Sequence, residues 1–87
     1  MDPNACLRTA PGVEINQLED GYVVYDPTKD RVHYLNPTAA LILELCNGQV
    51  PTRDLPTLVQ NAYNLTDPPH GEVNQCLQKL CEEGLIR

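Results

Sequence analysis

The sequence predicts an α+β domain in which a three-stranded antiparallel sheet is followed by three helices, in the order βββααα. Residues 13–35 contain three short β-prone runs separated by turn residues, and from residue 37 onward apolar residues recur at helical spacing. The 87 residues suffice for one domain, and 41% hydrophobic with 21% charged residues is an ordinary globular composition. We expect the helices to cover the apolar face of the sheet.

The first two strands are predicted from alternation and turn chemistry. Val13 and Ile15 alternate with polar neighbours, and Asp20-Gly21 then offers a tight hairpin turn. The run Tyr22-Val23-Val24-Tyr25 is rich in β-branched and aromatic residues, and residues 26–30 form a second turn that contains proline. These features predict an antiparallel meander.

The third strand, Arg31 to Leu35, can form an open edge of this sheet. Alternation places Val32 and Tyr34 on one face and Arg31, His33 and Leu35 on the other. Edge strands are usually protected by charge, a bulge or proline, but Arg31 is the only charge here and no proline interrupts the run. The strand is therefore a candidate for β-strand addition by an extended peptide.

The three helices are marked by capping residues and apolar periodicity. Asn36 followed by Pro37 predicts the start of the first helix, which is apolar nearly all round and ends at Gly48. Thr52 is predicted to cap the second helix, and Asp67, before two prolines, to start the third. Gly84 is predicted to end the third, with Leu85-Ile86 folding back onto the core. The apolar positions are Leu55, Leu58, Val59, Ala62 and Tyr63 in the second helix and Val73, Cys76, Leu77, Leu80 and Cys81 in the third.

The chain divides into a short arm and one domain. Residues 1–12 contain Pro3, Pro11 and Gly12 without any period, which predicts a flexible or loosely docked N-terminal arm, and residues 13–87 form the domain. No stretch approaches the roughly 18 apolar residues of a transmembrane helix, and the start lacks a signal-peptide layout. We expect a cytoplasmic protein.

The composition excludes several function classes. The chain has no Ser, Trp or Phe, so serine-nucleophile catalysis is excluded. Its net charge of -6 argues against a nucleic-acid partner, which would require a basic surface. His33 and His70 are the only histidines, and nothing in the sequence brings either near a thiol. No pair of carboxylates has a sequence neighbourhood that would separate their pKa values. We therefore expect a protein that is not an enzyme.

The four cysteines do not form a metal-binding pattern. Cys6, Cys46, Cys76 and Cys81 include no C-x-x-C pair, and the five-residue spacing of the last two makes their thiols diverge on a helix. Three of them lie within apolar patterns, as buried free thiols do. The sequence predicts neither a metal site nor a cofactor.

Several segments together resemble the PqqD family. They are GYVVYD (21–26), VHYLN (32–36), Thr38-Ala39, ILELCNG (42–48) and LCEEGLI (80–86). The similarity extends over residues 13–87 in the expected order. Each segment is a weak signal alone, and their joint order and spacing make the resemblance specific.

The resemblance implies a non-enzymatic peptide chaperone, also called a recognition element for ribosomally synthesised and post-translationally modified peptides. Such domains bind the leader segment of a precursor peptide as a strand added to the third strand, in a groove walled by the third helix. They present it to a modifying enzyme, often a radical SAM protein. Carried onto this sequence, the implied peptide-binding residues are Arg31, Val32, His33, Tyr34 and Leu35 in the strand and Val73, Cys76, Leu77 and Leu80 in the helix.

One departure from the family pattern concerns the pathway. Members that serve pyrroloquinoline quinone synthesis usually carry a Trp-containing second strand and then a proline-rich acidic segment, whereas this chain reads Tyr-Val-Val-Tyr and has no Trp. We therefore favour a relative that serves another modified peptide, with the quinone pathway left open.

Two alternative functions use the same elements. Three strands and three helices are also the inventory of a winged-helix DNA-binding domain, but residues 68–83 hold one Lys against Glu72, Glu82 and Glu83. The second alternative is a structural protein–protein module, or a homodimer, that pairs through the open third strand.

Overall fold

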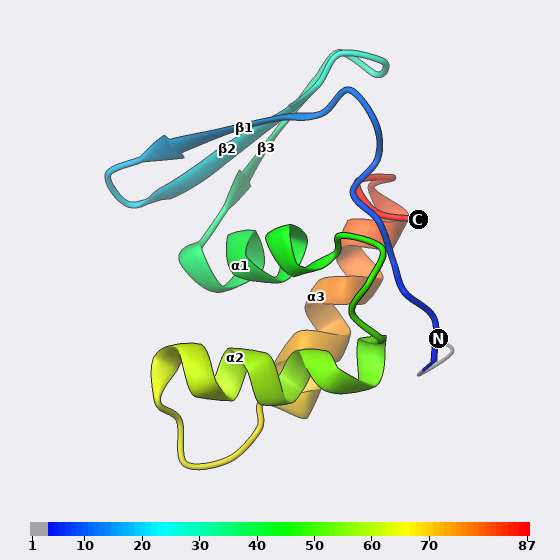
Figure 1. Cartoon of the computed structure of the whole chain (residues 1–87). Coiled ribbons are helices and arrows are strands. Elements are labelled where there is room, and N and C mark those ends of the chain that lie inside the picture. Colours follow the sequence, from blue (N-terminus) through cyan, green and yellow to red (C-terminus); the bar gives the residue numbers. More distant parts are fainter. Residues whose placement is uncertain (1–3) are drawn as a thin grey trace.

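The computed structural model describes residues 4–87 and confirms the predicted βββααα order. Strands β1 (Glu14–Leu18), β2 (Gly21–Asp26) and β3 (Arg31–Leu35) form one antiparallel sheet in the order β1-β2-β3. Helices α1 (Pro37–Leu45), α2 (Leu55–Tyr63) and α3 (His70–Glu82) follow and pack beneath the sheet (Figure 1).

The register of the sheet decides which residues of β3 face the helices. His33 pairs with Val24, which is fully buried, so His33 lies on the inner face. Tyr34, paired with Val23, is 77% exposed, and Val32 is 51% exposed, so these two face away from the helices. Strand β1 is exposed along its whole length, and its hairpin with β2 extends past the helices (Figure 1).

Gly21 marks a close approach between β2 and the end of β3. A Cβ at this position would lie 2.5 Å from the backbone oxygen of Leu35, closer than any side-chain carbon can come. Residue 21 must therefore lack a side chain for the sheet to keep this register. The hairpin turn lies at Glu19 and Asp20, one residue earlier than the predicted Asp20-Gly21, and Gly21 begins β2.

The start of α1 forms as predicted, whereas α2 and α3 begin later than the sequence indicates. The side chain of Asn36 accepts a hydrogen bond of 2.8 Å from the Ala39 N–H, which caps α1. Thr52 does not cap α2 directly but opens a 3-10 turn, Thr52–Asp54, that leads into the helix. Asp67 lies outside α3, because a residue before proline is disfavoured in helical conformation and Pro68 itself precedes Pro69.

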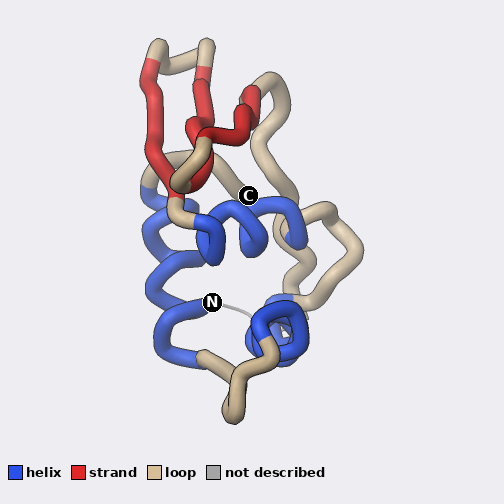
Figure 2. Tube along the Cα trace, turned by 90° about the vertical axis from the view of Figure 1, so that its left-hand side faces the viewer, coloured by secondary structure: helices blue, strands red, loops and turns tan. Residues whose placement is uncertain are grey.

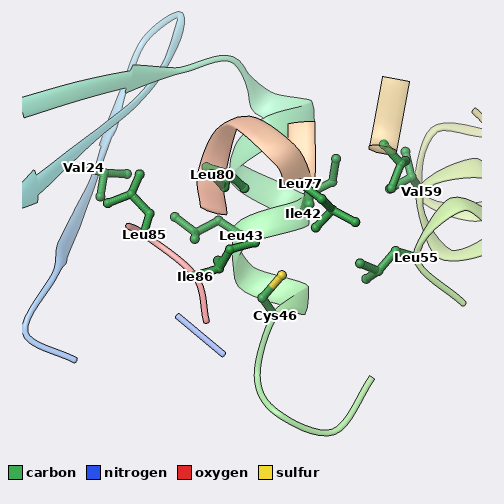
Figure 3. Close-up of a cluster of buried hydrophobic side chains, with 11 residues drawn as sticks. Val24, Ile42, Leu43, Cys46, Leu55, Val59, Leu77, Leu80, Leu85 and Ile86 are labelled. Carbon is green, nitrogen blue, oxygen red and sulfur yellow. The ribbon is translucent and has the colours of Figure 1, made fainter. Parts of the chain in front are cut away.

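The hydrophobic core lies around α1 (Figure 3), as its apolar sequence predicts. Leu85 and Ile86 are both buried, which confirms that the C-terminal residues fold back. The buried cluster comprises Val24, Ile42, Leu43, Cys46, Leu55, Val59, Val73, Leu77, Leu80, Leu85 and Ile86.

Part of the N-terminal arm contacts the domain through its backbone. Arg8 and Arg87 exchange two backbone hydrogen bonds of 2.8 Å, and the Ala10 N–H donates to the Leu85 carbonyl. The Thr9 hydroxyl donates to backbone carbonyls near the end of α1, at Leu43 and at Cys46. The segment thus lies beside the C-terminus (Figure 1), while residues 1–3 of the arm lie outside the described residues and its flexibility stays a prediction.

No helix within residues 4–87 is both long and apolar enough to cross a bilayer.

Candidate functional site

A groove of about 490 Å³ lies between β3 and α3. The two elements lie on the same side of the molecule, where β3 descends toward the start of α1 and α3 rises to meet it (Figure 2). The lining residues are Val32, His33, Tyr34, Leu35, Asn36, Ala39, Glu72, Gln75, Cys76, Lys79, Leu80, Glu83 and Leu85.

Strand β3 is an edge of the sheet, as predicted. It pairs with β2 on one side, and in the part of the chain that the structure describes no other strand pairs with it. In an antiparallel sheet, alternate residues of an edge strand direct their N–H and C=O groups outward. The groove is therefore bordered by backbone groups that another strand can pair with.

The floor of the groove is largely apolar. Leu80 and Leu85 belong to the core and are nearly fully buried, yet both contribute to the lining. Leu35, Ala39 and Cys76 continue this surface and are only partly buried. A ligand that covers the groove would remove their remaining apolar area from water, which is favourable.

A polar clasp closes the end of the groove where β3 begins. Glu83, just after α3, lies 3.5 Å from the Arg31 guanidinium and 3.8 Å from His33 Nδ1. The Lys29 ammonium also donates a 3.2 Å hydrogen bond to the Glu83 carbonyl. These contacts join the β2–β3 hairpin to the end of α3. Cationic side chains are stabilising near a helix C-terminus.

His33 lies at the centre of this clasp with one nitrogen unused. Its side chain is only 12% exposed, and Nδ1 faces Glu83. Nε2 is buried and has no hydrogen-bond partner within the described residues. A buried polar nitrogen without a partner is unusual and is most readily satisfied by water or by a ligand.

Cys76 lies midway along the groove-facing side of α3. Burial raises the pKa of its thiol, Glu72 raises it further, and Lys79 opposes this shift. All four cysteines are free, with Cys6 exposed, Cys46 buried, and Cys76 and Cys81 partly buried. Cys76 is thus a neutral thiol that acts as part of the apolar floor.

Six of the nine predicted peptide-binding residues come together at the groove: Val32, His33, Tyr34, Leu35, Cys76 and Leu80. Arg31 lies beside them, paired with Glu83. Val73 and Leu77 are instead buried in the core, because they lie on the side of α3 that packs on the rest of the domain. The contact of each residue with a peptide stays a prediction.

Sequence reasoning missed the polar residues that line the groove from α3. Glu72, Gln75, Lys79 and Glu83 do so although none belongs to the apolar pattern. Successive members of this set are three or four residues apart, as residues on one helix face are, and this spacing is the signal that could have found them.

Within residues 4–87, no group of three or more His, Cys, Asp or Glu side chains is placed to hold a metal ion. His70 is exposed at the first turn of α3. What the groove offers is an apolar floor and an unpaired strand edge, which suit binding of an extended chain.

The residues of the groove and of all three helices lie within a segment that matches a protein-family model. Residues 21–86 match the family model described as coenzyme PQQ synthesis protein D (PqqD). The chain belongs to the PqqD family. This confirms the resemblance found in the sequence; strand β1 lies outside the matched residues, whereas β3, α1 and α3 lie within them.

A solved structure shares the fold of this PqqD-family chain. Lasso peptide synthetase B1, solved in complex with the leader peptide, matches with a TM-score of 0.76 and 21% sequence identity. The match covers 95% of this chain and 99% of the other. No curated protein sequence matches the chain significantly.

Proposed function

We propose that this PqqD-family protein is a non-catalytic chaperone that binds the leader segment of a ribosomally synthesised precursor peptide and presents it to a modifying enzyme. The leader adds as a strand to the outer edge of β3. The observation that carries this proposal is the open β3 edge beside a groove with an apolar floor. Both family membership and the fold shared with a leader-bound lasso peptide synthetase support it.

The chemistry of the pathway belongs, in this proposal, to the partner enzyme, which we expect to be a radical SAM protein. The groove supplies shape and backbone pairing, with His33 and Glu83 held together in the clasp and Cys76 forming part of the apolar floor. The missing Trp in β2 favours a modified peptide other than the quinone precursor. Helix α3 carries the acidic residues Glu72 and Glu82, and Glu83 follows it directly. This negative charge disfavours the alternative that α3 reads DNA.

The proposal is tested by titrating the full chain with the leader peptide of the precursor encoded beside its gene and following backbone amide signals. Strand addition should perturb the signals of residues 31–35 and 72–80 and leave those of α2 unchanged. Perturbations spread evenly over the chain, or none at saturating peptide, would contradict it. A short precursor gene next to a radical SAM gene would support the expected partner.

Proline substitution along β3 tests strand addition itself. Adjacent residues of a strand direct their N–H groups to opposite sides of the strand. His33→Pro and Tyr34→Pro therefore remove donors on opposite sides of β3, one facing β2 and the other facing outward. The variant whose lost N–H points outward should keep its fold by circular dichroism and lose peptide binding. The other should lose β2–β3 pairing and stability, and His33→Ala should weaken binding little. Equal binding by both folded proline variants would exclude backbone pairing.

The same edge supports a second candidate, a homodimer formed by β3 pairing with its copy. Val32 and Tyr34 are both more than half exposed beside this edge, which gives such a pairing apolar contacts. Sedimentation over a range of concentrations distinguishes the two functions. A dimer that dissociates when leader peptide is added would show that both use β3, whereas a dimer that persists beside bound peptide would place its interface elsewhere.

A further inference from the structure

The groove-facing side of α3 carries a defined order of side chains. Glu72, Cys76 and Lys79 are separated by four and three residues, so they lie in one row along the helix. Between the two charges the helix rises about 10 Å. Glu72 and Lys79 are exposed, whereas Cys76 between them is partly buried.

Among the described residues that line the groove, Glu72 and Lys79 are the charged side chains without an ion pair. Glu83 differs, because Arg31 and His33 already face its carboxylate. Both charges act on the groove, since Glu72 raises the pKa of the Cys76 thiol and Lys79 lowers it. A bound peptide therefore meets a negative charge, an apolar patch and a positive charge in sequence along α3.

The order of these charges relative to β3 follows from the clasp. Glu83 lies at the start of β3, beside Arg31, so Glu72 lies toward the opposite end of the groove. A strand that continues the antiparallel sheet runs opposite to β3, and so meets the Glu72 end first and the Lys79 end last. In an extended chain, side chains on one face recur every second residue, about 6.6 Å apart.

We propose that this groove selects extended peptides that carry a basic, an apolar and an acidic side chain in that order, at every second position. The basic side chain lies toward Glu72, the apolar one over Cys76, and the acidic one toward Lys79. This inference rests on the proposed function, because it requires strand addition to β3. It adds the class of leader that the site accepts.

The test uses synthetic 15-residue peptides with β-prone flanks and three central patterns: Lys-x-Leu-x-Asp, the reversed Asp-x-Leu-x-Lys, and the uncharged Gln-x-Leu-x-Asn. Each is titrated into the full chain at low and high salt. The first peptide should bind about tenfold more tightly than the second, since each exposed ion pair contributes a factor of a few. The difference should shrink at high salt, which screens exposed charges.

A double charge exchange supplies the decisive comparison. The variant Glu72→Lys with Lys79→Glu keeps the net charge of -6 and should prefer the reversed peptide. The matched control, Glu82→Lys with Arg87→Glu, also keeps the net charge and changes exposed residues that do not line the groove. It should keep the original preference.

The outcomes separate this inference from the proposed function. If the double exchange leaves the preference unchanged, or if the three peptides bind equally while perturbing residues 31–35, the charge order is refuted and peptide binding at β3 stands. If none of these peptides, nor the leader peptide itself, perturbs residues 31–35, the proposed function fails and this inference fails with it.

Discussion

Alkylation of the four cysteines gives a direct measure of whether a peptide occupies the groove. Cys76 lines the groove, whereas Cys81, on the same helix, is also partly buried but lies outside the lining. Leader peptide should therefore slow the reaction of Cys76 with iodoacetamide and leave Cys81 unchanged. Cys6 is exposed and serves as a second unprotected reference.

The expected protection follows from occupancy. At a free peptide concentration of twenty times Kd, about one chain in twenty-one is unoccupied, so Cys76 should react about twentyfold more slowly. The assay is quenched alkylation followed by mass spectrometry of proteolytic fragments, which resolves the four cysteines in one sample. Repeating it at several peptide concentrations gives Kd independently of the amide titration.

Cys46 sets the lower limit of reactivity in the same experiment. Burial raises the pKa of its thiol from 9.0 to about 12. At neutral pH this leaves about a thousandfold less thiolate than in an unshifted cysteine, and only the thiolate is nucleophilic. Cys46 should therefore stay unmodified with or without peptide until the protein unfolds.

Two results would refute the reasoning. Equal slowing of Cys76 and Cys81 would indicate a general loss of motion or an altered fold instead of cover over the groove. Rapid alkylation of Cys46 in the native protein would show that the core around α1 is open to solvent. If the peptide still slows alkylation of Cys76 in a proline variant of β3 that cannot pair with it, the peptide occupies the groove without strand addition.

Three further predictions concern stability and are checked by urea unfolding. Leu77→Ala should cost about 2–5 kcal/mol because the residue is fully buried, whereas Tyr34→Ala on the open face should change stability by less than about 0.5 kcal/mol. Asn36→Ala should cost about 1 kcal/mol by removing the cap of α1, and near-zero loss would show that water replaces it. Gly21→Ala should cost about 1–3 kcal/mol because its Cβ meets a backbone oxygen, while Gly71→Ala, which faces open space, should be neutral or stabilising.

The boundaries of the elements show where local signals succeed. The cap at Asn36 and the close packing at Gly21 coincide with strong local preferences, and the structure places a helix start and a hairpin there. Helices α2 and α3 begin later than the sequence predicts, and the reasons are also local. A 3-10 turn at Thr52 and the double proline after Asp67 each delay the regular helix.

The sequence alone determined the order of the elements and the open character of β3, because alternation and capping are local properties. The tertiary structure alone decided which residues of α3 reach the groove. Val73, Cys76, Leu77 and Leu80 share one apolar pattern. Only the packing of α3 against α1 and α2 separates Cys76 and Leu80, which border the groove, from the two that do not.

The contacts of Glu83 in the clasp were also decided only by the tertiary structure. Its partners Arg31 and His33 lie about fifty residues earlier in the chain, and nothing in their sequence spacing indicates that they meet. Helices α1 and α2 lie between β3 and α3 in the chain, so the end of α3 reaches the start of β3 only when these helices are packed. Long-range pairs of this kind depend on how the layers pack, which local preferences do not specify.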